Sequence, residues 1–486
     1  MQFYNTLSKH KEEFIPGTPG QVSLYACGIT AYDYCHIGHA RSAVAFDVLV
    51  RYLRSQGLNV TFIRNFTDVD DKIITRAAQE GSSSEAIAEK YINAFHEDMD
   101  RLDVQRATVE PRATEHIGDM LNLIAILVDK GHAYATPSGD VYFRVRSFSS
   151  YGKLSGRSVD DLRSGARIAP GEEKEDPLDF ALWKSAKPGE PAWDSPWGRG
   201  RPGWHIECSA MSEKYAPLPL DMHGGGLDLI FPHHENEIAQ TEAAIDGPFC
   251  RFWIHNGFVQ VDSEKMSKSL GNFKTIRDIL ESYLPEILRY FLVARHYRSP
   301  IDFTFEAMEE AEKNVRRMYE TIMQVRQQLE RNKWSGAKIA PEFAAELDEL
   351  EKAWDGAMAD DLNTAAAIGH MNNVIRLMNR LMEDKGASKS EDAKTLYSRF
   401  LGDLERWSGI LGVFFQDPSV FLAELKAVRA HRAGLDVATI DALMQERREA
   451  RMTKDFAKSD QIRDAIVALG AVVRDTPQGA EWDIAG

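Results

Sequence analysis

A pair of histidines stands at the start of a helical pattern near the N-terminus of the chain. The sequence His36-Ile37-Gly38-His39 leads into apolar residues that repeat at helical spacing from 40 to 56. A helix N-terminus offers unpaired N–H groups and the positive end of the helix dipole to a phosphate. Both histidines can donate to phosphoryl oxygens, and the glycine leaves room for a nucleotide against the backbone. The spacing therefore indicates a phosphate site, with simple helix capping as the alternative.

Two cysteines, a histidine and a glutamate form a dispersed set with the chemistry of a metal site. His233 and Glu237 are four residues apart, so on a helix both point the same way. Cys27 ends a β-type run, and Cys208 closes the sequence GWHIEC. Two thiolates, one imidazole and one carboxylate suit a tetrahedral Zn2+, which could add a further thiolate. Spacing alone leaves a plain alternative open, because His-x-x-x-Glu pairs are common on helix surfaces and no CxxC pair is present.

A substrate cysteine would be a suitable added ligand for such a metal. Serine is nearly isosteric with cysteine, but its hydroxyl is a much weaker ligand than a thiolate. Shape alone separates such substrates by about 10–200-fold, whereas some biological reactions need roughly 10^4-fold discrimination. A bond to sulfur could supply the difference.

The elements around the histidine pair are predicted to form a strand–turn–helix–strand unit. Residues 21–26 predict a strand, Gly28 a turn, residues 40–56 a helix that stops at Gly57, and residues 59–66 a second strand. This order is typical of a right-handed crossover in a parallel sheet. Its first turn would face the carboxyl end of the sheet, where ligands bind.

The middle of the chain alternates helical and strand patterns around a loop-rich segment. We expect a helix from about 68 to 101, another over 114–130, a hairpin over 131–146 and loops over 147–203. Residues 221–240 return to strand and helix patterns, and residues 252–261 predict a buried strand. Residues 111–201 are interpreted as an insertion within a nucleotide-binding fold. Residues 198–203 match GxGxxG, but no predicted strand precedes them and Pro202 stands where a helix would begin, which excludes a dinucleotide fingerprint.

Beyond residue 283 the patterns are almost wholly helical. One apolar seam runs over 315–329, and Asn363 is expected to cap a helix over 364–382. A link at Pro418 is expected to precede a small final unit. Its helical hairpin gathers five basic residues, which suit either a solvated face or a nucleic-acid contact. They are Arg447, Arg448, Arg451, Lys454 and Lys458.

Length and composition describe a multidomain protein without membrane or secretion signals. The 486 residues allow about three domains of roughly 150 residues each. The net charge of −16 argues against a non-specific nucleic-acid binder, but not against docking through a local basic patch. Four cysteines are too few for a disulfide framework, and Cys35 and Cys250 are expected to be packing thiols. No signal peptide or membrane span is recognised, so a cytoplasmic protein is expected.

A second motif far downstream joins the histidine pair. Lys265-Met266-Ser267-Lys268-Ser269 together with residues 36–39 resembles the KMSKS and HIGH signatures of class I aminoacyl-tRNA synthetases. Across essentially its whole length the chain resembles the cysteinyl-tRNA synthetase family. The matching stretches are YACGITAYDYCHIGHAR, NFTDVDDKI, WGRGRPGWHIECSAMS, DMHGGGLDLIFPHHENEIAQ, EKMSKSLGN, ADDLNTAAA and KDFAKSDQIRDAIVALGAVVRDTPQGAEW.

The resemblance implies an α/β fold with a Rossmann-type parallel-sheet catalytic domain. Together with the sequence texture, it predicts a catalytic domain over 1–280 with a connective insertion over about 111–201, a stem-contact region over 281–310, a helical bundle over 311–417 and a small anticodon-binding domain over 418–486.

The implied activity is that of a cysteine–tRNA ligase. Cysteine would be activated with ATP to cysteinyl-adenylate and pyrophosphate, and then passed to the terminal ribose of tRNA(Cys). One Zn2+ per chain and Mg2+ with ATP are implied as cofactors, and the zinc would bind the substrate thiolate and disfavour serine. A monomer with no membrane partner is expected. Because no protein nucleophile is needed, catalysis would rest on positioning and charge stabilisation.

The resemblance also assigns residues. It places the zinc ligands at Cys27, Cys208, His233 and Glu237, and the cysteine pocket at Gly28, Thr67, Trp204 and Asp228. It assigns ATP binding to His36, Gly38, His39 and Lys268, and catalysis to His36, His39, Lys265 and Lys268. The chain departs from the family pattern after Trp482, where acidic and apolar residues replace basic ones, which puts a tRNA contact from the extreme C-terminus in doubt.

Two other functions fit part of these observations. A related ligase passes activated cysteine to an amino sugar, as in mycothiol assembly, but such proteins lack the roughly 200 residues that follow the KMSKS motif here. A catalytically silent paralogue would serve as a binding or regulatory module. Cysteine-dependent exchange of pyrophosphate into ATP would be absent in that case.

Overall fold

The fold is organised around a four-stranded parallel sheet. The computed structural model describes residues 1–160, 173–261, 264–265, 274–331, 333–336, 338–476 and 479–484. Every neighbouring pair in the central sheet is parallel, which confirms the predicted crossover. The strands are β3 (Gln21–Thr30), β4 (Asn59–Thr67), β9 (Leu220–Gly226) and β10 (Cys250–Asn256), in the order β10-β9-β3-β4.

Alternating residues of β3 and β4 bury the two faces of this sheet in different cores. Leu24 and Phe62 belong to the core that contains α1 (Ile37–Ser55). Tyr25 and Ile63 instead belong to a core with Cys208 of α6 (Trp204–Tyr215). Because side chains alternate across a strand, α1 and α6 cover opposite faces. Cys208 of α6, a predicted metal ligand, therefore lies on the face of the sheet opposite to α1, the helix that begins at the histidine pair.

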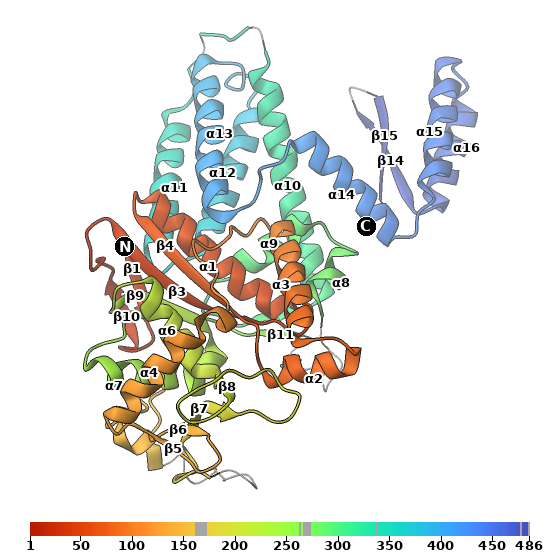
Figure 1. Ribbon diagram of the computed structural model, residues 1–486. Coiled ribbons are helices and arrows are strands. Elements are labelled where there is room, and N and C mark those ends of the chain that lie inside the picture. Colours follow the sequence, from red (N-terminus) through yellow and green to blue (C-terminus); the bar gives the residue numbers. More distant parts are fainter. Residues whose placement is uncertain are drawn as a thin grey trace.

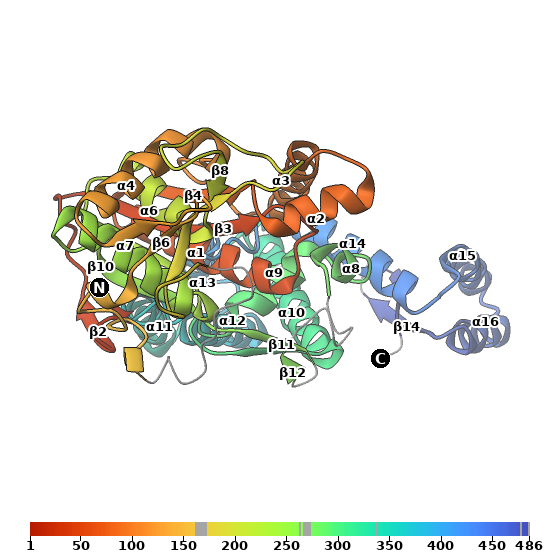
Figure 2. The ribbon, with the colours of Figure 1, turned by 60° about the horizontal axis from the view of Figure 1, so that its bottom comes forward.

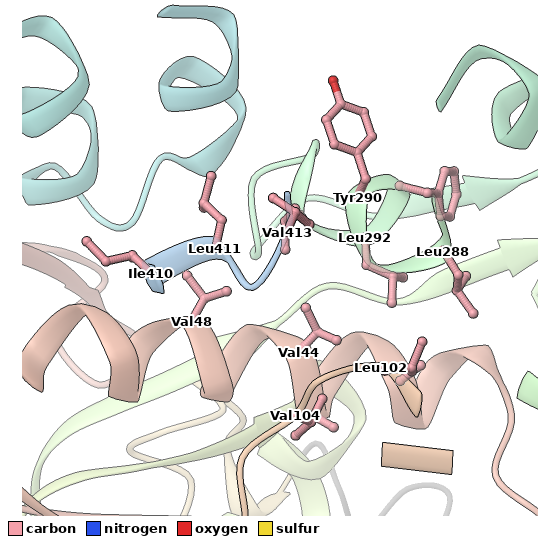
Figure 3. Packing of buried hydrophobic residues seen from close by; sticks show 14 of the residues in the cluster. Val44, Val48, Leu102, Val104, Leu288, Tyr290, Leu292, Ile410, Leu411 and Val413 are labelled. Atoms are coloured by element: carbon pink, nitrogen blue, oxygen red, sulfur yellow. The ribbon is translucent and has the colours of Figure 1, made fainter. Parts of the chain in front are cut away.

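Helix α1 is buried on nearly all sides, which fixes its position. Val44 and Val48 pack against residues from the ends of three other helices, as Figure 3 shows. These neighbours include Leu292 of α9 (Pro285–Val293) and Leu411 of α13 (Glu391–Leu411). The helix that begins at the histidine pair is thus packed against both the central sheet and the helical half of the chain.

The inserted region is a helix and a four-stranded antiparallel sheet. The sheet order is β5 (Ala133–Ala135), β6 (Val141–Phe143), β7 (Phe180–Ser185) and β8 (Gly200–Pro202). The predicted hairpin is confirmed, but the prediction of loops over 147–203 is wrong for β7 and β8. Both strands are short, and β8 contains glycine and proline, so neither shows an alternating pattern. Helix α4 (Ile117–Asp129) packs beside this sheet and is preceded by a 3-10 turn, Ala113–His116.

The helix predicted from about 68 to 101 is two helices. They are α2 (Asp71–Glu80) and α3 (Ser84–Arg101), and Gly81 ends the first with a left-handed conformation. The predicted buried strand over 252–261 is also divided. It forms β10 and β11 (Val259–Val261), which belong to different sheets. A Cβ at Gly257 between them would lie 2.4 Å from the Ser299 carbonyl oxygen, so only glycine allows this break.

The second half of the chain is a helical bundle followed by a separate small unit (Figure 1). Asn363 accepts from the Ala366 N–H at 3.0 Å, which confirms the predicted cap. Pro418 starts a helix instead of forming a link, because proline is well suited to a first helical turn. The helices are α8 (Ile276–Leu280), α9, α10 (Phe305–Leu329), α11 (Pro341–Ala359), α12 (Thr364–Glu383), α13, α14 (Pro418–Arg432), α15 (Val437–Met452) and α16 (Phe456–Ala468).

Three small sheets complete the structure. They are β1 (Gln2–Asn5) with β2 (His10–Glu13), β12 (Glu264–Lys265) with β11 and β13 (Ile301–Phe303), and β14 (Ala471–Thr476) with β15 (Gly479–Ile484). Helix α14 connects the bundle to the C-terminal unit of α15, α16, β14 and β15, which projects from the rest of the molecule in Figure 2. No helix among the described residues is long and apolar enough to cross a bilayer.

Candidate active site

The candidate site lies at the carboxyl ends of the parallel strands. Cys27 and Gly28 lie near the end of β3, and Thr67 ends β4. Asp228 follows β9 in the turn Leu227–Leu229, and Trp204 begins α6. Ligands bind at this edge in open parallel sheets, so the topology makes it the candidate site.

His36 and His39 cap α1 in a way that fixes their tautomers. His36 Nδ1 accepts from the Gly38 N–H at 3.0 Å, and His39 Nδ1 accepts from the His36 N–H at 3.2 Å. A neutral imidazole that accepts at Nδ1 carries its proton on Nε2. Each ring can therefore donate from Nε2, and the first turn of α1 contains no acidic residue that would compete with a phosphate. Capping and phosphate binding are thus compatible roles here.

The start of α1 is hydrogen-bonded to residues 274–276, which lie a few positions after the second motif. Ile37 N donates to Lys274 O at 3.2 Å, and Ile276 N donates to Cys35 O at 2.9 Å. On the other flank, the backbone of Lys265 in β12 pairs with Gln260 of β11. Lys268 and the rest of 266–273 lie outside the described residues, and so does the side chain of Lys265. The backbone is nevertheless held on both sides of residues 266–273. Lys265 pairs with β11, and residues 274–276 bond to the start of α1.

Cys27 and Gly28 occupy an irregularity in the pairing of β3 with β4. The register shifts between Ala26 and Ile29, so one extra residue faces β4. Gly28 N donates to Asn65 Oδ1 at 2.9 Å, and a Cβ at Gly28 would lie 1.6 Å from Asn65 O. The predicted turn at Gly28 is therefore wrong: the strand continues, and the glycine is needed because β4 approaches so closely. Such bulges re-aim neighbouring side chains.

The four predicted metal ligands converge on one point. Cys27 Sγ lies 3.8 Å from Cys208 Sγ and 3.5 Å from Glu237 Oε1, and His233 Nε2 lies 3.0 Å from the same carboxylate oxygen. All four ligand atoms lie within 4.8 Å of one another. His233 stands at the end of the short turn Ile230–His234, and Glu237 is in the first turn of α7 (Glu235–Ile245). This cluster could hold a metal ion.

The protonation of this cluster also suits a cation. Burial raises the pKa of Cys208, but the hydrogen bond from Cys27 and the charge of His233 outweigh it and lower the pKa to about 6. Burial likewise opposes ionisation of Glu237, but His223 and His233 hold its pKa well below the usual value. Burial lowers the pKa of His233, whereas Glu237 and Cys208 raise it to about 10. Two buried anions thus face one protonated histidine, whose proton a metal ion could replace.

A second combination of ligands shares Cys27 and Glu237 but uses His223 and His234. His223 Nε2 already donates to Glu237 Oε2 at 2.8 Å, because an ionised carboxylate only accepts. By contrast, His233 Nε2 faces the other oxygen, Glu237 Oε1, at 3.0 Å, which Cys27 Sγ also approaches. The set with Cys208 and His233 is therefore the better candidate, and His223 orients its carboxylate.

The expected cysteine-pocket residues differ in how closely they approach this cluster. The Trp204 ring stacks on His233 with centroids 4.1 Å apart and is 39% exposed, so it forms an accessible wall beside the cluster. Thr67 is buried, and its hydroxyl donates to Glu207 Oε2 at 2.6 Å. Asp228 is exposed, and its carboxylate lies over Gly226.

Several residues at the site were not predicted from the sequence. They are His223, which holds Glu237, His205, which contacts His233 (Nδ1 to Nδ1, 2.9 Å), Asn65, which fills the bulge, and Glu207, which holds Thr67. Each acts on a partner from a distant segment, so no local spacing reveals it. The one signal in the sequence was a histidine between Met222 and three glycines, in a segment with strand patterning, since a polar residue that becomes buried needs a partner.

Three family models match successive parts of the sequence. They are described as tRNA synthetases class I (C) catalytic domain over residues 13–313, DALR domain over 353–416 and Cysteinyl-tRNA ligase anticodon binding domain over 437–482. A cysteine–tRNA ligase of Nitratidesulfovibrio vulgaris (strain DP4) is 66% identical over 484 residues and 100% of both chains. That of Oleidesulfovibrio alaskensis (strain G20) is 64% identical over 485 residues and 100% of both chains.

Solved structures with low sequence identity share the fold. A Mycobacterium tuberculosis methionyl-tRNA synthetase in complex with methionyl-adenylate gives a TM-score of 0.58 at 16% identity, covering 80% of this chain and 89% of that chain. A ternary LeuRS–tRNA–LeuAMS complex from Agrobacterium radiobacter K84 gives 0.59 at 12% identity, covering 82% and 86%. These likenesses concern the arrangement of the polypeptide alone.

Proposed function

Because the chain belongs to the cysteine–tRNA ligase family, we propose that it charges tRNA(Cys) with cysteine at the expense of ATP. Full-length relatives at 66% and 64% identity support this function. The observation that carries it is the convergence of Cys27, Cys208, His233 and Glu237 beside the exposed ring of Trp204. A site that could bind a thiolate, close to a helix N-terminus that could bind phosphate, suits the activation of cysteine by ATP.

In the first step, the carboxylate of cysteine attacks the α-phosphate of ATP. An oxygen–phosphorus bond forms to give cysteinyl-adenylate, and pyrophosphate leaves. His36 and His39 donate to phosphoryl oxygens from Nε2, and the start of α1 adds its dipole. Lys265 and Lys268 neutralise the departing pyrophosphate, and Gly38 lets the nucleotide approach the backbone. Mg2+ would accompany ATP and share its phosphate charge.

We assign one Zn2+ per chain to Cys27, Cys208, His233 and Glu237. The approach of His233 Nε2 to Glu237 Oε1 and the paired thiols support this assignment. When bound, zinc would supply a site for the substrate thiolate that a serine hydroxyl fills poorly. The pocket for the substrate cysteine would be bounded by Trp204 and lined by Thr67 and the Gly28 backbone. Asp228 would lie at its exposed rim.

His223 is expected to support metal binding through Glu237. Replacing His223 with leucine removes the donor to Glu237 Oε2, and we expect zinc affinity to fall by about 10–100-fold. Glutamine at the same position retains an N–H donor and should lose less. Competition with a zinc-binding dye measures both affinities. Equal zinc affinity in the leucine variant and the parent protein would contradict the role of His223.

In the second step, the terminal ribose hydroxyl of tRNA attacks the carbonyl carbon of the adenylate, and AMP leaves. The match of residues 437–482 to an anticodon-binding model supports tRNA as the acceptor. Of the five basic residues in the α15–α16 hairpin, Arg448, Arg451, Lys454 and Lys458 are exposed, whereas Arg447 is buried. We propose that the protein acts as a monomer in the cytoplasm, where translation takes place.

Cysteine-dependent exchange of labelled pyrophosphate into ATP tests the activation step. We expect exchange with cysteine and at least about 10^4-fold less efficient exchange with serine. The absence of exchange with either amino acid would overturn the proposal in favour of a silent paralogue.

A further inference from the structure

A buried aspartate in the helical bundle contacts the catalytic half of the chain. Asp361 lies in the turn between α11 and α12 and is fully buried. Asp361 and Leu362 both have positive φ, at 61° and 49°. Non-glycine residues rarely adopt this conformation unless the surroundings enforce it. Asp361 N also donates to Gln2 O at 2.9 Å, which joins the turn to β1.

The carboxylate of Asp361 is held by four donors from outside the bundle. Oδ1 accepts from Tyr4 N at 2.8 Å and from the Tyr297 hydroxyl at 2.7 Å. Oδ2 accepts from Arg298 Nε and Nη2, each at 2.7 Å. His296 Nε2 lies 3.6 Å from the same oxygen. A buried carboxylate with this many donors is a strong and directional anchor.

The same segment is held from its other side by the histidine helix. Arg41 of α1 is buried and donates to Leu292 O, to Arg295 O at 3.5 Å and to His296 O at 2.6 Å. These carbonyls lie at the C-terminal end of α9, where the helix dipole favours a cation. Residues 292–298 are thus clamped between Arg41, five residues after His36, and Asp361 of the bundle.

This clamped segment supports the strands that lead to Lys265. Gly257 N donates to Tyr297 O at 2.8 Å, and Ile301 N donates to Phe258 O at 2.9 Å. Strand β13 then pairs with β11 in parallel, residues 301–303 facing 259–261. Strand β11 in turn pairs with β12, so a shift of the clamped segment would move the backbone of Lys265 relative to α1.

We infer that Asp361 is a positioning residue that aligns the β11–β12 strands, and with them Lys265, against the helix that begins at His36. It acts through Tyr297 and Arg298 and touches no substrate. The inference rests on the proposed function for its kinetic consequence, but the mechanical coupling can be measured without any activity. It also gives the helical bundle a part in the activation step, before tRNA binds.

The test variant is Asp361→Asn. Asparagine matches aspartate in shape and tolerates positive φ, so the turn is retained while the charge is lost. Asp360→Asn is the matched control, because Asp360 forms an exposed pair with Lys11 at 2.7 Å. Tyr297→Phe is a milder second variant, which removes one hydroxyl whose partner is Asp361 and tests the coupling even if Asp361→Asn does not fold.

Hydrogen exchange and kinetics are measured together on active-site-titrated protein. In Asp361→Asn we expect faster exchange of the Gly257 and Ile301 amides, unchanged exchange in α7 and unchanged zinc content. We expect the kcat for pyrophosphate exchange to fall by about 10–100-fold, as for a misplaced catalytic group. The KM for cysteine should stay within about twofold. Tyr297→Phe should show smaller changes in the same direction, and Asp360→Asn none.

A merely structural role would lower the melting temperature and leave kcat of the titrated protein unchanged. Unchanged amide exchange in a folded Asp361→Asn or Tyr297→Phe variant, or equal effects of Asp360→Asn, would overturn the inference. If the parent protein showed no cysteine-dependent exchange of pyrophosphate into ATP, only the proposed function would fail. Faster hydrogen exchange of the Gly257 and Ile301 amides in the variants would then still support the coupling.

Discussion

Replacing Cys208 with serine is expected to abolish zinc retention and to lower kcat/KM for cysteine by about 10^3–10^4-fold, because the bond that distinguishes sulfur from oxygen is lost. Cys208 is the most acidic thiol of the cluster, with a pKa of about 6, since Cys27 and His233 stabilise its thiolate against the cost of burial. A serine hydroxyl does not ionise there and is a poor zinc ligand.

The fold should tolerate this change. Serine is nearly isosteric with cysteine, and Cys208 lies within α6, whose other buried residues are unaffected. Cys250→Ser is the matched control: it alters a buried thiol outside the ligand set, and serine can keep the hydrogen bond to Phe252 O. Metal content by mass spectrometry and cysteine kinetics measure the effect. Retained zinc together with unchanged cysteine affinity in Cys208→Ser would rule out the ligand assignment.

Replacing Lys268 with alanine is expected to slow adenylate formation by about 10^2–10^3-fold, the loss typical of one group that stabilises developing charge. Affinity for ATP should change much less, because the lysine acts as pyrophosphate departs and not in the ground state. Pre-steady-state measurements at several ATP concentrations separate the two effects.

The flanks of this motif explain why the lysine should reach the phosphates. Lys265 pairs through its backbone with Gln260, and Lys274 O accepts from Ile37 N at the start of α1. Lys214→Ala provides a control, because Lys214 is an exposed lysine of the same domain that pairs with Asp119 at 3.2 Å. Weakened ATP binding with an unchanged rate of adenylate formation would refute the assigned role of Lys268.

The sequence predicted the strand–helix–strand unit because its local patterns are strong. Residues 40–56 have clear helical spacing and a glycine stop, and both flanking strands are apolar. The spacing of His233 and Glu237 likewise predicted that both would point the same way. That Cys27 and Cys208 would meet them followed only from the family resemblance, since the four ligands come from three separate segments.

The predictions of secondary structure were wrong where a contact with backbone from a segment distant in sequence determines the local conformation. Gly28 suggested a turn, but it is a strand residue that accommodates Asn65 of the neighbouring strand. Gly257 divides a continuous apolar run, because the carbonyl of Ser299 approaches it. Strand β8 contains glycine and proline and is recognisable only beside β7. In each case the deciding contact is made with a segment that the local pattern does not include.

The supporting residues of the site were missed for the same reason. His223 matters because it faces Glu237, and Asp361 matters because it faces Tyr297 and Arg298. Neither pair is close in sequence, so spacing does not identify the partner. Such partners become visible only when the burial and hydrogen bonds of the folded chain are known.

Charging of tRNA tests the central claim most directly. Purified protein is incubated with ATP, Mg2+, labelled cysteine and total tRNA, and acid-precipitable label is counted with and without a zinc chelator. We predict label on tRNA that falls sharply on chelation and returns when zinc is restored. Cysteine-dependent pyrophosphate exchange without any label on tRNA would contradict the account, because it would move the acceptor from tRNA to a small molecule.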